Sequence, residues 1–408
     1  MNIQDLMYYE KAHGAQTYLP LDVVLTRGEG VWVYDSEGRK YLDGLSAYSA
    51  LNQGHCHPQL VNVMTKQAGT LTLTSRAFRN DQYPLLLRRL SQLTGYDAAL
   101  PMNTGVEAVE TAIKLARKWA YTVKGVAPNR AEIIIMQGNF HGRSITAISC
   151  STERLYREHF GPYTPGFVTV PYGDIQAIES SITPQTAAIL LEPIQGEAGV
   201  IVPPEGYLQK VRKICDQANV LMLVDEIQTG LGRTGKLFAH QHEGIRPDMV
   251  IIGKALSGGM YPVSAVLADR SLMDLFQPGE HGSTFGGNPL GAAVAIAALN
   301  VLIDEQLIEN AAALGTYALQ RLRELSSPLV KEVRGKGLLI GIELQPEAAT
   351  ARRFCETLKD EGILCKETHE MVIRFAPPLI IDQETLEWAL SRIAKVLYTS
   401  TPKHDYSQ

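Results

Sequence analysis

Short apolar runs alternate with amphipathic helical stretches between residues 133 and 268, and this alternation restricts the possible folds more than any other feature of the chain. The apolar runs lack regularly spaced polar residues, which is typical of strands that are covered on both faces, as in a parallel sheet. An amphipathic stretch at residues 205–218 separates two of these runs, as it would in a β-α-β unit. The sequence therefore predicts an α/β sandwich with a mostly parallel sheet. The expected strands are residues 133–136, 188–191, 221–224, 250–252 and 263–267.

The two ends of the chain have a different pattern. Residues 28–43 predict two short strands joined by a turn, and the chain after Gly291 predicts long helices, two further strands and a last helix. We expect these ends to fold together as a smaller α+β domain. The expected division is residues 1–48 for an N-terminal segment of the small domain, 49–294 for the large domain and 295–408 for the rest of the small domain. The last ten residues, 399–408, are polar and are expected to be loosely held.

Composition excludes some classes of partner. The chain has 408 residues, a formal net charge of −5 and no run of basic residues, so we expect no nucleic-acid binding. The longest apolar stretch, residues 289–303, is interrupted by Gly291 and Asn300. It is too short to cross a bilayer and predicts a buried, alanine-rich helix, so no membrane segment is expected.

The N-terminus and the cysteines bear on location. The first ten residues carry Asp5 and Glu10 and lack the apolar core of a secretory signal and the arginines of a mitochondrial presequence. The five cysteines are scattered and show no CxxC spacing, which fits reduced thiols in a reducing compartment. We therefore expect a cytoplasmic protein.

Charged residues follow three of the predicted strands. Glu192 follows the predicted strand at residues 188–191, and Asp225 follows the one at 221–224. Lys254 comes two positions after the strand at 250–252. In an open parallel sheet, ligands bind beyond the carboxyl ends of the strands, so these side chains are expected to face one cavity. A lysine there can form a Schiff base with an aldehyde cofactor, and an aspartate can keep a pyridinium nitrogen protonated. Taken singly, such a lysine is more often a solvated loop residue, and such an aspartate is often a helix cap.

Two further motifs bear on ligand binding. Gly105 and Val106 open a helical stretch at residues 107–121, and the N-terminus of a helix can bind phosphate, although a glycine in this place is common. His55 and His57 lie on one short loop without further ligands nearby in sequence, so no metal site is expected.

Segments along nearly the whole chain resemble those of a known family. The chain is similar to the class III pyridoxal-phosphate-dependent aminotransferases of fold type I, and within them to the ornithine aminotransferases. DEIQTG followed by GKALSGG is highly specific for the class. The matching segments are LSAYSALNQGHCHP (45–58), LTLTSRAF (71–78), PMNTGVEA (101–108), GNFHGR (138–143), EPIQGEAGV (192–200), VDEIQTGLGRTG (224–235), GKALSGGMYPVSAV (253–266), GEHGSTFGGNPLG (279–291), VRGKGLL (333–339) and IRFAPPL (373–379).

The resemblance implies that the large domain binds pyridoxal 5'-phosphate. Lys254 would hold the cofactor covalently and then carry the proton between substrate and cofactor, while Asp225 would pair with the pyridine nitrogen. Gln228 would hydrogen-bond the phenolic oxygen, and Phe140 would stack on the ring.

The resemblance also implies where the phosphate lies. Gly105 and Val106 would bind it through their backbone, and Thr284 would complete the site from the neighbouring subunit, so the enzyme would be a homodimer with active sites at the subunit interface.

For the substrates, the resemblance implies transfer of the δ-amino group of L-ornithine to 2-oxoglutarate by a ping-pong mechanism, giving glutamate 5-semialdehyde and glutamate. Arg143 would bind the far carboxylate and Arg374 the near α-carboxylate of 2-oxoglutarate, since an arginine offers a bidentate fork to a carboxylate. Glu197 would cover Arg374 during the first half-reaction. Tyr18 and Tyr48 would hold the carboxylate and α-amine of ornithine.

Alternatives remain open within and outside this class. The chain could instead be an acetylornithine or a 4-aminobutyrate aminotransferase. The substrates of those enzymes have no free α-amine, so the presence of Tyr48, which would hold that amine, argues against both. A non-catalytic paralogue that binds the cofactor would be expected to have lost Lys254, Asp225 or an arginine. One departure is His141, where some ornithine aminotransferases have tryptophan; it flanks the ring-stacking residue and is expected to affect packing rather than chemistry.

Overall fold

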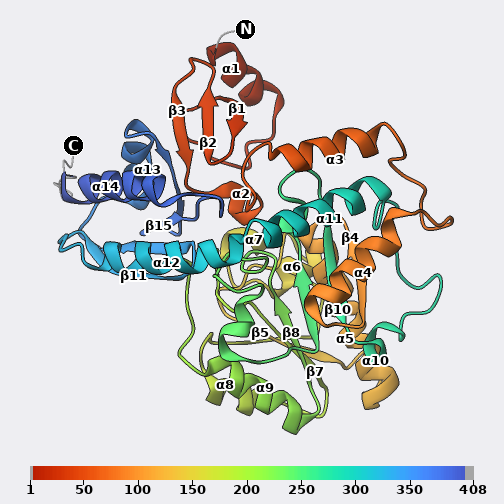
Figure 1. The fold of residues 1–408 in the computed structure, drawn as a ribbon. Coiled ribbons are helices and arrows are strands. Elements are labelled where there is room, and N and C mark those ends of the chain that lie inside the picture. The colour runs from red at the N-terminus through yellow and green to blue at the C-terminus, as the bar shows by residue number, and fades with distance from the viewer. Residues whose placement is uncertain (1–2, 400–408) are drawn as a thin grey trace.

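The computed structural model describes residues 3–399, and its centre is a seven-stranded sheet (Figure 1). The strand order is β4-β10-β9-β8-β7-β5-β6, and only β10 runs antiparallel to its neighbours. This confirms the predicted α/β fold and all five predicted strands, while β4 and β6 were not predicted. The strands are β4 (Ala98–Met102), β5 (Glu132–Met136), β6 (Phe167–Val170), β7 (Thr186–Leu191), β8 (Leu221–Asp225), β9 (Met249–Ile252) and β10 (Ser264–Ala268).

Both faces of the central sheet are covered, which explains why its strands lack polar alternation. In β5, Ile133 and Ile135 pack in one core cluster with α5 (Gly105–Trp119), while Ile134 and Met136 pack in another with α9 (Tyr207–Ala218). Successive side chains of a strand point to opposite faces, so a strand buried on both faces has to be apolar throughout. The predicted helix at 205–218 begins two residues later, after Gly206 at φ +74°.

The two ends of the chain meet in a pair of four-stranded sheets. One has the order β1-β2-β3-β13 and the other β11-β12-β15-β14. The short β13, from the C-terminal part, pairs in parallel with β3 from the N-terminal part. These strands are β1 (Leu25–Glu29), β2 (Trp32–Asp35), β3 (Lys40–Asp43), β11 (Val330–Lys336), β12 (Leu339–Leu344), β13 (Ile363–Leu364), β14 (Lys366–Thr368) and β15 (Val372–Phe375).

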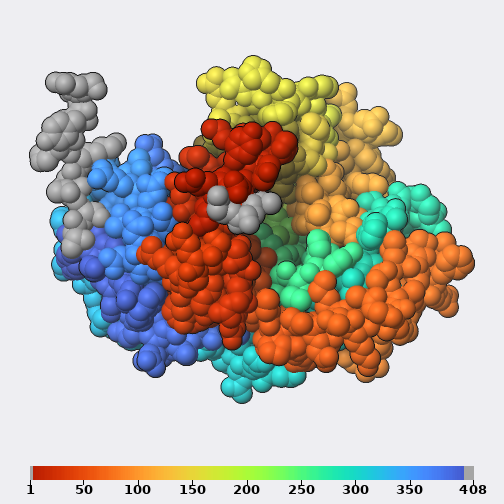
Figure 2. Space-filling model, turned by 90° about the horizontal axis from the view of Figure 1, so that it is seen from above, coloured from red at the N-terminus to blue at the C-terminus, as the bar shows by residue number. Residues whose placement is uncertain are grey.

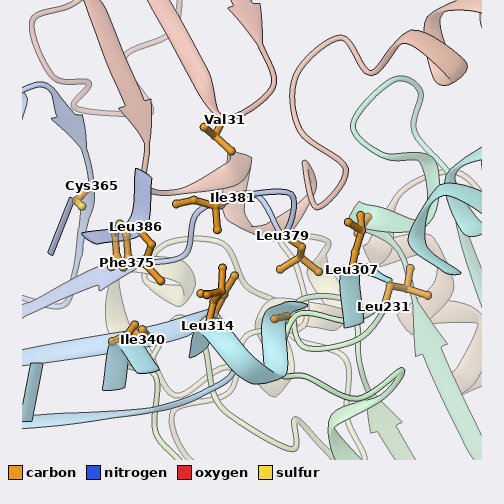
Figure 3. Close-up of a cluster of buried hydrophobic side chains, with 14 of the residues drawn as sticks. Val31, Leu231, Leu307, Leu314, Ile340, Cys365, Phe375, Leu379, Ile381 and Leu386 are labelled. Carbon is orange, nitrogen blue, oxygen red and sulfur yellow. The ribbon is translucent and has the colours of Figure 1, made fainter. Parts of the chain in front are cut away.

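A shared apolar core holds the ends together. Figure 3 shows Val31, from the turn between β1 and β2, near Ile381, with Leu386 in the same group of side chains, and all three belong to one buried cluster. This contact supports the expectation that the ends fold together, while the exact domain boundaries stay a prediction.

The remaining helices surround the sheets (Figure 1). The predicted alanine-rich helix is present as α11, which begins after the Asn288 cap and is buried along most of its length. No single helix among residues 3–399 is long and apolar enough to cross a membrane. One bent pair of helices, α11 with α12, would be long and apolar enough when the two are taken together, by length and composition only. The predicted loose tail lies outside the described residues except for Thr399. These helices are α1 (Ile3–His13), α2 (Ser46–Ser49), α3 (Pro58–Ala68), α4 (Gln82–Thr94), the π-helix η1 (Ala120–Lys124), α6 (Ile145–Cys150), α7 (Arg154–Arg157), α8 (Ile175–Ser181), the 3-10 helices η2 (Ala239–Glu243) and η3 (Lys254–Ser257), α10 (Arg270–Met273), α11 (Pro289–Asp304), α12 (Leu307–Arg323), α13 (Ala351–Asp360) and α14 (Gln383–Thr399).

Seen from above, the surface is hollowed between the N-terminal segment in red and the yellow and orange segments, with green residues from the middle of the chain on the floor (Figure 2). The carboxyl ends of the central strands supply the residues of the candidate site described next.

Candidate active site

A cavity of about 200 Å³ lies at the carboxyl ends of the central strands. Its walls come from the ends of β7, β8 and β9, from the start of α5 and from the segment after β5. The structure therefore brings together residues that are far apart in sequence, as the position of the strand ends predicts. Seven residues that the sequence predicts for the site line it: Gly105, Val106, Phe140, Glu197, Asp225, Gln228 and Lys254.

Lys254 is held in an unusual backbone conformation at the end of β9. Its φ is +44°, in the left-handed region that non-glycine residues rarely adopt, and such strain is found mainly at functional sites. Burial lowers the pKa of the Lys254 amine to about 8, because the charged form loses water, and Arg374 lowers it further while Glu197 opposes the shift. A larger fraction of Lys254 is therefore uncharged near neutral pH than of an exposed lysine, as a nucleophilic amine requires.

Asp225 is buried and fixed by two hydrogen bonds. Its Oδ2 lies 2.7 Å from Nδ1 of His141, and its Oδ1 accepts the backbone N–H of Ile227 at 3.0 Å. Burial by itself would lower the pKa of His141, but the hydrogen bond and charge of Asp225 raise it. His141 therefore contacts a chemical group of the site directly, and the expectation that it affects packing alone was too narrow.

The start of α5 is built to accept an anion. Thr104 caps the helix, and the Glu107 side chain accepts the backbone N–H groups of Asn103 at 2.9 Å and Thr104 at 2.8 Å. The first N–H groups inside a helix have no intrahelical acceptor and attract phosphate. A side chain at Gly105 would meet Ile227 at 3.0 Å, so a glycine keeps this end of the helix open.

Gly142 fixes the segment after β5 against this helix. Its φ is +124°, and a Cβ there would lie 2.6 Å from the Val106 side chain. The lysine, the buried carboxylate and the helix N-terminus in one cavity thus fit the aldehyde, the pyridine nitrogen and the phosphate of pyridoxal phosphate.

Arg374 and Glu197 form the predicted ion pair beside Lys254. Arg374 is 1% exposed, and its Nη1 donates to Oε1 of Glu197 at 2.6 Å. Gln228 also donates to this oxygen, at 3.0 Å. Burial would raise the pKa of Glu197, but the charge of Arg374 lowers it to about 2. Nε and Nη2 of Arg374 are buried without a partner among the described residues, so part of its fork is left for another group.

The other predicted arginine stacks on an aromatic ring. The Arg143 guanidinium lies 3.7 Å from the ring centroid of Tyr156 and 5.5 Å from that of Phe140. No ion pair of Arg143 is found within residues 3–399, and a stacked, unpaired guanidinium suits carboxylate recognition.

The predicted tyrosines lie outside the cofactor cavity. Tyr48 is close to it, with its ring centroid 5.1 Å from the Arg374 guanidinium. Tyr18 is 75% exposed and lines, with Tyr48, a neighbouring groove of about 540 Å³. Thr284 is exposed and does not line the cavity of its own chain, so its role across a subunit interface stays a prediction.

Tyr48 lies on a left-handed turn. Ser46, Ala47, Tyr48 and Ser49, which form α2, have φ values of +53°, +46°, +62° and +70°. The Asp43 carboxylate stabilises the entry to this turn by accepting the backbone N–H groups of the two residues that precede Ala47, at 2.9 and 2.8 Å. No glycine marks the turn, so the sequence does not predict it.

Other residues near the site were missed by sequence reasoning. Ile227 and Thr229 line the cavity, and Tyr156 supports Arg143, but no local pattern distinguishes them. Glu192 also lines the cavity; its position after a strand predicts that it faces the cavity but not what it does there.

The two histidines considered for a metal have carboxylate partners instead. His55 Nε2 lies 2.7 Å from Asp43 and His57 Nε2 lies 2.9 Å from Glu305. Within residues 3–399, no group of three or more His, Cys, Asp or Glu side chains could hold a metal ion.

Comparisons with known proteins agree with this geometry. The sequence model of the family "Aminotransferase class-III" matches residues 13–397. The chain is 57% identical to an ornithine aminotransferase of Brevibacillus brevis, over 95% of this chain and 96% of that protein. The solved ornithine aminotransferase of Toxoplasma gondii has a TM-score of 0.96 and 45% identity, covering 97% of this chain and 94% of that one. The solved acetylornithine aminotransferase of Elizabethkingia anophelis has a TM-score of 0.89 and 49% identity, covering 97% and 99%.

A cavity that joins the lysine, the carboxylate and the anion-binding helix, and a family match over nearly the whole chain, lead to one conclusion: this chain belongs to the class III aminotransferase family.

Proposed function

We propose that this class III aminotransferase transfers the δ-amino group of L-ornithine to 2-oxoglutarate, giving glutamate 5-semialdehyde and glutamate in two half-reactions. As a member of its family it is a pyridoxal-phosphate-dependent transaminase. The observation that carries the choice of substrate is the buried Glu197–Arg374 pair beside Lys254, because it covers one carboxylate-binding arginine while Arg143 has no ion pair among residues 3–399.

Pyridoxal phosphate supplies an electron sink for the bond that breaks next to the substrate nitrogen. Lys254 would bind it covalently and then move the proton, and Asp225 would hold the proton at the ring nitrogen. Gln228 would donate to the phenolic oxygen and Phe140 would stack on the ring. These roles are supported by the common cavity.

The phosphate would be bound by the backbone of Gly105 and Val106, with Thr284 contributed by a second subunit. We therefore propose a homodimer. We also propose that it works in the cytoplasm, in the metabolism that connects arginine and proline through ornithine, since glutamate 5-semialdehyde can cyclise.

The two arginines would bind different carboxylates in the two half-reactions. In the first, Arg143 would bind the α-carboxylate of ornithine while Glu197 covers Arg374, so that ornithine presents its distal amine to Lys254. Tyr18 and Tyr48 would hold the amino-acid end of ornithine. In the second, Glu197 would move aside, and the two arginines would bind the two carboxylates of 2-oxoglutarate. This step is supported by the buried Arg374 guanidinium, two nitrogens of which have no hydrogen-bond partner in the described part of the chain.

A comparison of amino donors tests the proposal. Purified, cofactor-loaded protein is given 2-oxoglutarate with ornithine, acetylornithine or 4-aminobutyrate, and glutamate formation is measured. We expect the highest kcat/KM with ornithine. A higher value with acetylornithine, which the likeness to the Elizabethkingia anophelis protein makes the main competing donor, would contradict the proposal, as would cofactor binding without turnover.

A further inference from the structure

Glu192 is a buried carboxyl group of the cofactor cavity to which the proposed function gives no task. It follows β7 directly, is 6% exposed and lines the cavity together with Asp225 and Lys254. Its Oε2 accepts the backbone N–H of Phe140 at 3.0 Å. No ion pair of Glu192 is found in the described part of the chain, unlike Glu197, which pairs with Arg374.

The segment that Glu192 contacts carries several parts of the site. Asn139 begins it and donates its amide to the carbonyls of Met136 at 2.6 Å and Cys150 at 2.8 Å, which fixes the segment to its own strand and helix. Across the sheet, the segment has two side-chain anchors at neighbouring strand ends. Glu192 accepts the N–H of Phe140, and Asp225 pairs with the next residue, His141, at 2.7 Å.

A carboxyl group in this environment is more stable with its proton than without it. An unpaired charge in a closed cavity loses its hydration, and one backbone N–H does not replace it. Burial raises the pKa of Glu192 to about 8; His141 opposes this shift, while Asp225 and Glu197 add to it. The other titratable groups that face it are Lys254, whose charge it influences, and Tyr172, whose hydroxyl donates to the Glu192 carbonyl at 2.9 Å.

We propose that Glu192 is a positioning residue that works as an uncharged carboxylic acid and anchors Phe140 and His141 at the cofactor cavity. An uncharged anchor holds the segment without placing a second negative charge beside Asp225, whose own charge is needed at the ring nitrogen. The proposal rests on the proposed function, because the positions of Phe140 and His141 matter to chemistry only if the cavity holds pyridoxal phosphate.

Glu192→Gln tests the protonation state, because glutamine has the shape of the uncharged acid and still accepts the N–H of Phe140. The wild-type chain must take up a proton at Glu192 on folding, since its pKa is about 8 in the folded state and 4.5 when exposed. Its stability therefore falls relative to that of Glu192→Gln as the pH rises from about 4.5 to about 8. We expect the cofactor-loaded variant to melt at or above the wild-type temperature at pH 7.5, with a difference that grows between pH 5.5 and 8.

Glu226→Gln is the matched control. Glu226 is also buried, but it accepts hydrogen bonds from His240 at 2.9 Å and from Thr229 at 2.5 Å. Although burial would raise the pKa of Glu226, these partners lower it. Glutamine there should lower the melting temperature at every pH above 4.5. If Glu192→Gln also lowers it, with no dependence on pH, Glu192 is charged and the proposal is wrong.

The dissociation constant of pyridoxal phosphate tests the anchoring. Losing one hydrogen bond at Phe140 should weaken binding about 2- to 10-fold in Glu192→Leu, while Glu192→Gln stays within about twofold of wild type. Unchanged binding in both variants would overturn the anchoring. Failure of the proposed function looks different, because wild-type protein would then bind the cofactor with its usual affinity but show a higher kcat/KM with acetylornithine or 4-aminobutyrate than with ornithine, or no turnover at all.

Discussion

At the scale of single residues, the site depends on charges that are held away from water. Lys254 has a pKa of about 8 because burial disfavours its ammonium form, whereas Glu197 has a pKa of about 2 because Arg374 overcomes the effect of burial. Near neutral pH, this combination gives an uncharged fraction of the lysine beside a fully charged carboxylate. The same two shifts make the chemistry of the cavity sensitive to pH.

The attachment of pyridoxal phosphate to cofactor-free protein should follow the uncharged fraction of Lys254. We expect the rate to rise about tenfold per pH unit below pH 8 and to level off above it, because only the neutral amine reacts. In Glu197→Gln the midpoint should move below 8, since the charge of Glu197 raises the pKa of Lys254. Stopped-flow absorbance measures this rate. A midpoint near the ordinary lysine value of 10.5 would show that Lys254 is not enclosed as described.

Glu197→Ala should expose Arg374 to substrate carboxylates. The arginine would lose its only ion-pair partner in the described structure, and its fork could bind the α-carboxylate of ordinary amino acids. We expect kcat/KM for a plain α-amino acid such as alanine to rise about 10- to 100-fold, the equivalent of one charged hydrogen bond.

Glu343→Ala is the control for this change. Glu343 pairs with another buried arginine, Arg334, and does not line the cavity. It should leave the donor profile as it is. If the relative kcat/KM values for the amino donors are also unchanged in Glu197→Ala, Glu197 does not cover Arg374.

At the scale of elements, the sequence predicts the long and regular ones best. Five central strands were predicted because each contains a continuous apolar run, and α5 and α9 because their apolar residues have helical spacing. The long alanine-rich run of α11 and the last helix, α14, were also predicted. β4 was missed because Pro101 argues against a strand; it is tolerated since β4 lies at the edge of the sheet, where proline removes no essential hydrogen bond. β6 lies at the other edge of the sheet, and its sequence FVTV is only partly buried and includes the polar Thr169, so it does not form a continuous apolar run.

The left-handed α2 was also beyond prediction, and it allows a test of its strain. Ala47→Gly should stabilise the protein by about 0.5–1 kcal/mol, because a left-handed alanine costs roughly 1–2 kcal/mol and a glycine there is limited mainly by its entropy. Ala313→Gly, at an exposed position of the right-handed α12, should instead destabilise it by about 1 kcal/mol. Denaturant unfolding measures both. A loss of stability in both variants would contradict the left-handed conformation.

At the scale of the whole molecule, the sequence predicts which residues meet at the site, but it does not predict the contacts that these residues make with one another. The strand-end rule places Asp225 and Lys254 in one cavity, and the resemblance adds Gln228 and Phe140. The contact of His141 with Asp225 joins residues 84 positions apart, and the anchor of Phe140 on Glu192 spans 52. Such contacts depend on the register of neighbouring strands, which no local pattern specifies.

Mixed dimers test the proposed assembly. If Thr284 serves the phosphate of the neighbouring subunit, a dimer of one Lys254→Ala and one Thr284→Ala chain contains one intact site and one doubly altered site. We expect such a dimer to bind cofactor at one site with wild-type affinity, whereas Thr284→Ala alone binds it more weakly at both. Weak binding at every site of the mixed dimer would place Thr284 in its own subunit's site.

The most direct measurement for the whole account is to locate the covalent cofactor. Borohydride reduction of the cofactor-loaded protein, followed by proteolysis and mass spectrometry, identifies the modified lysine. The account predicts a single pyridoxyl-phosphate adduct, on Lys254, at the end of β9 and facing Asp225. An adduct on another lysine, or none, would contradict it.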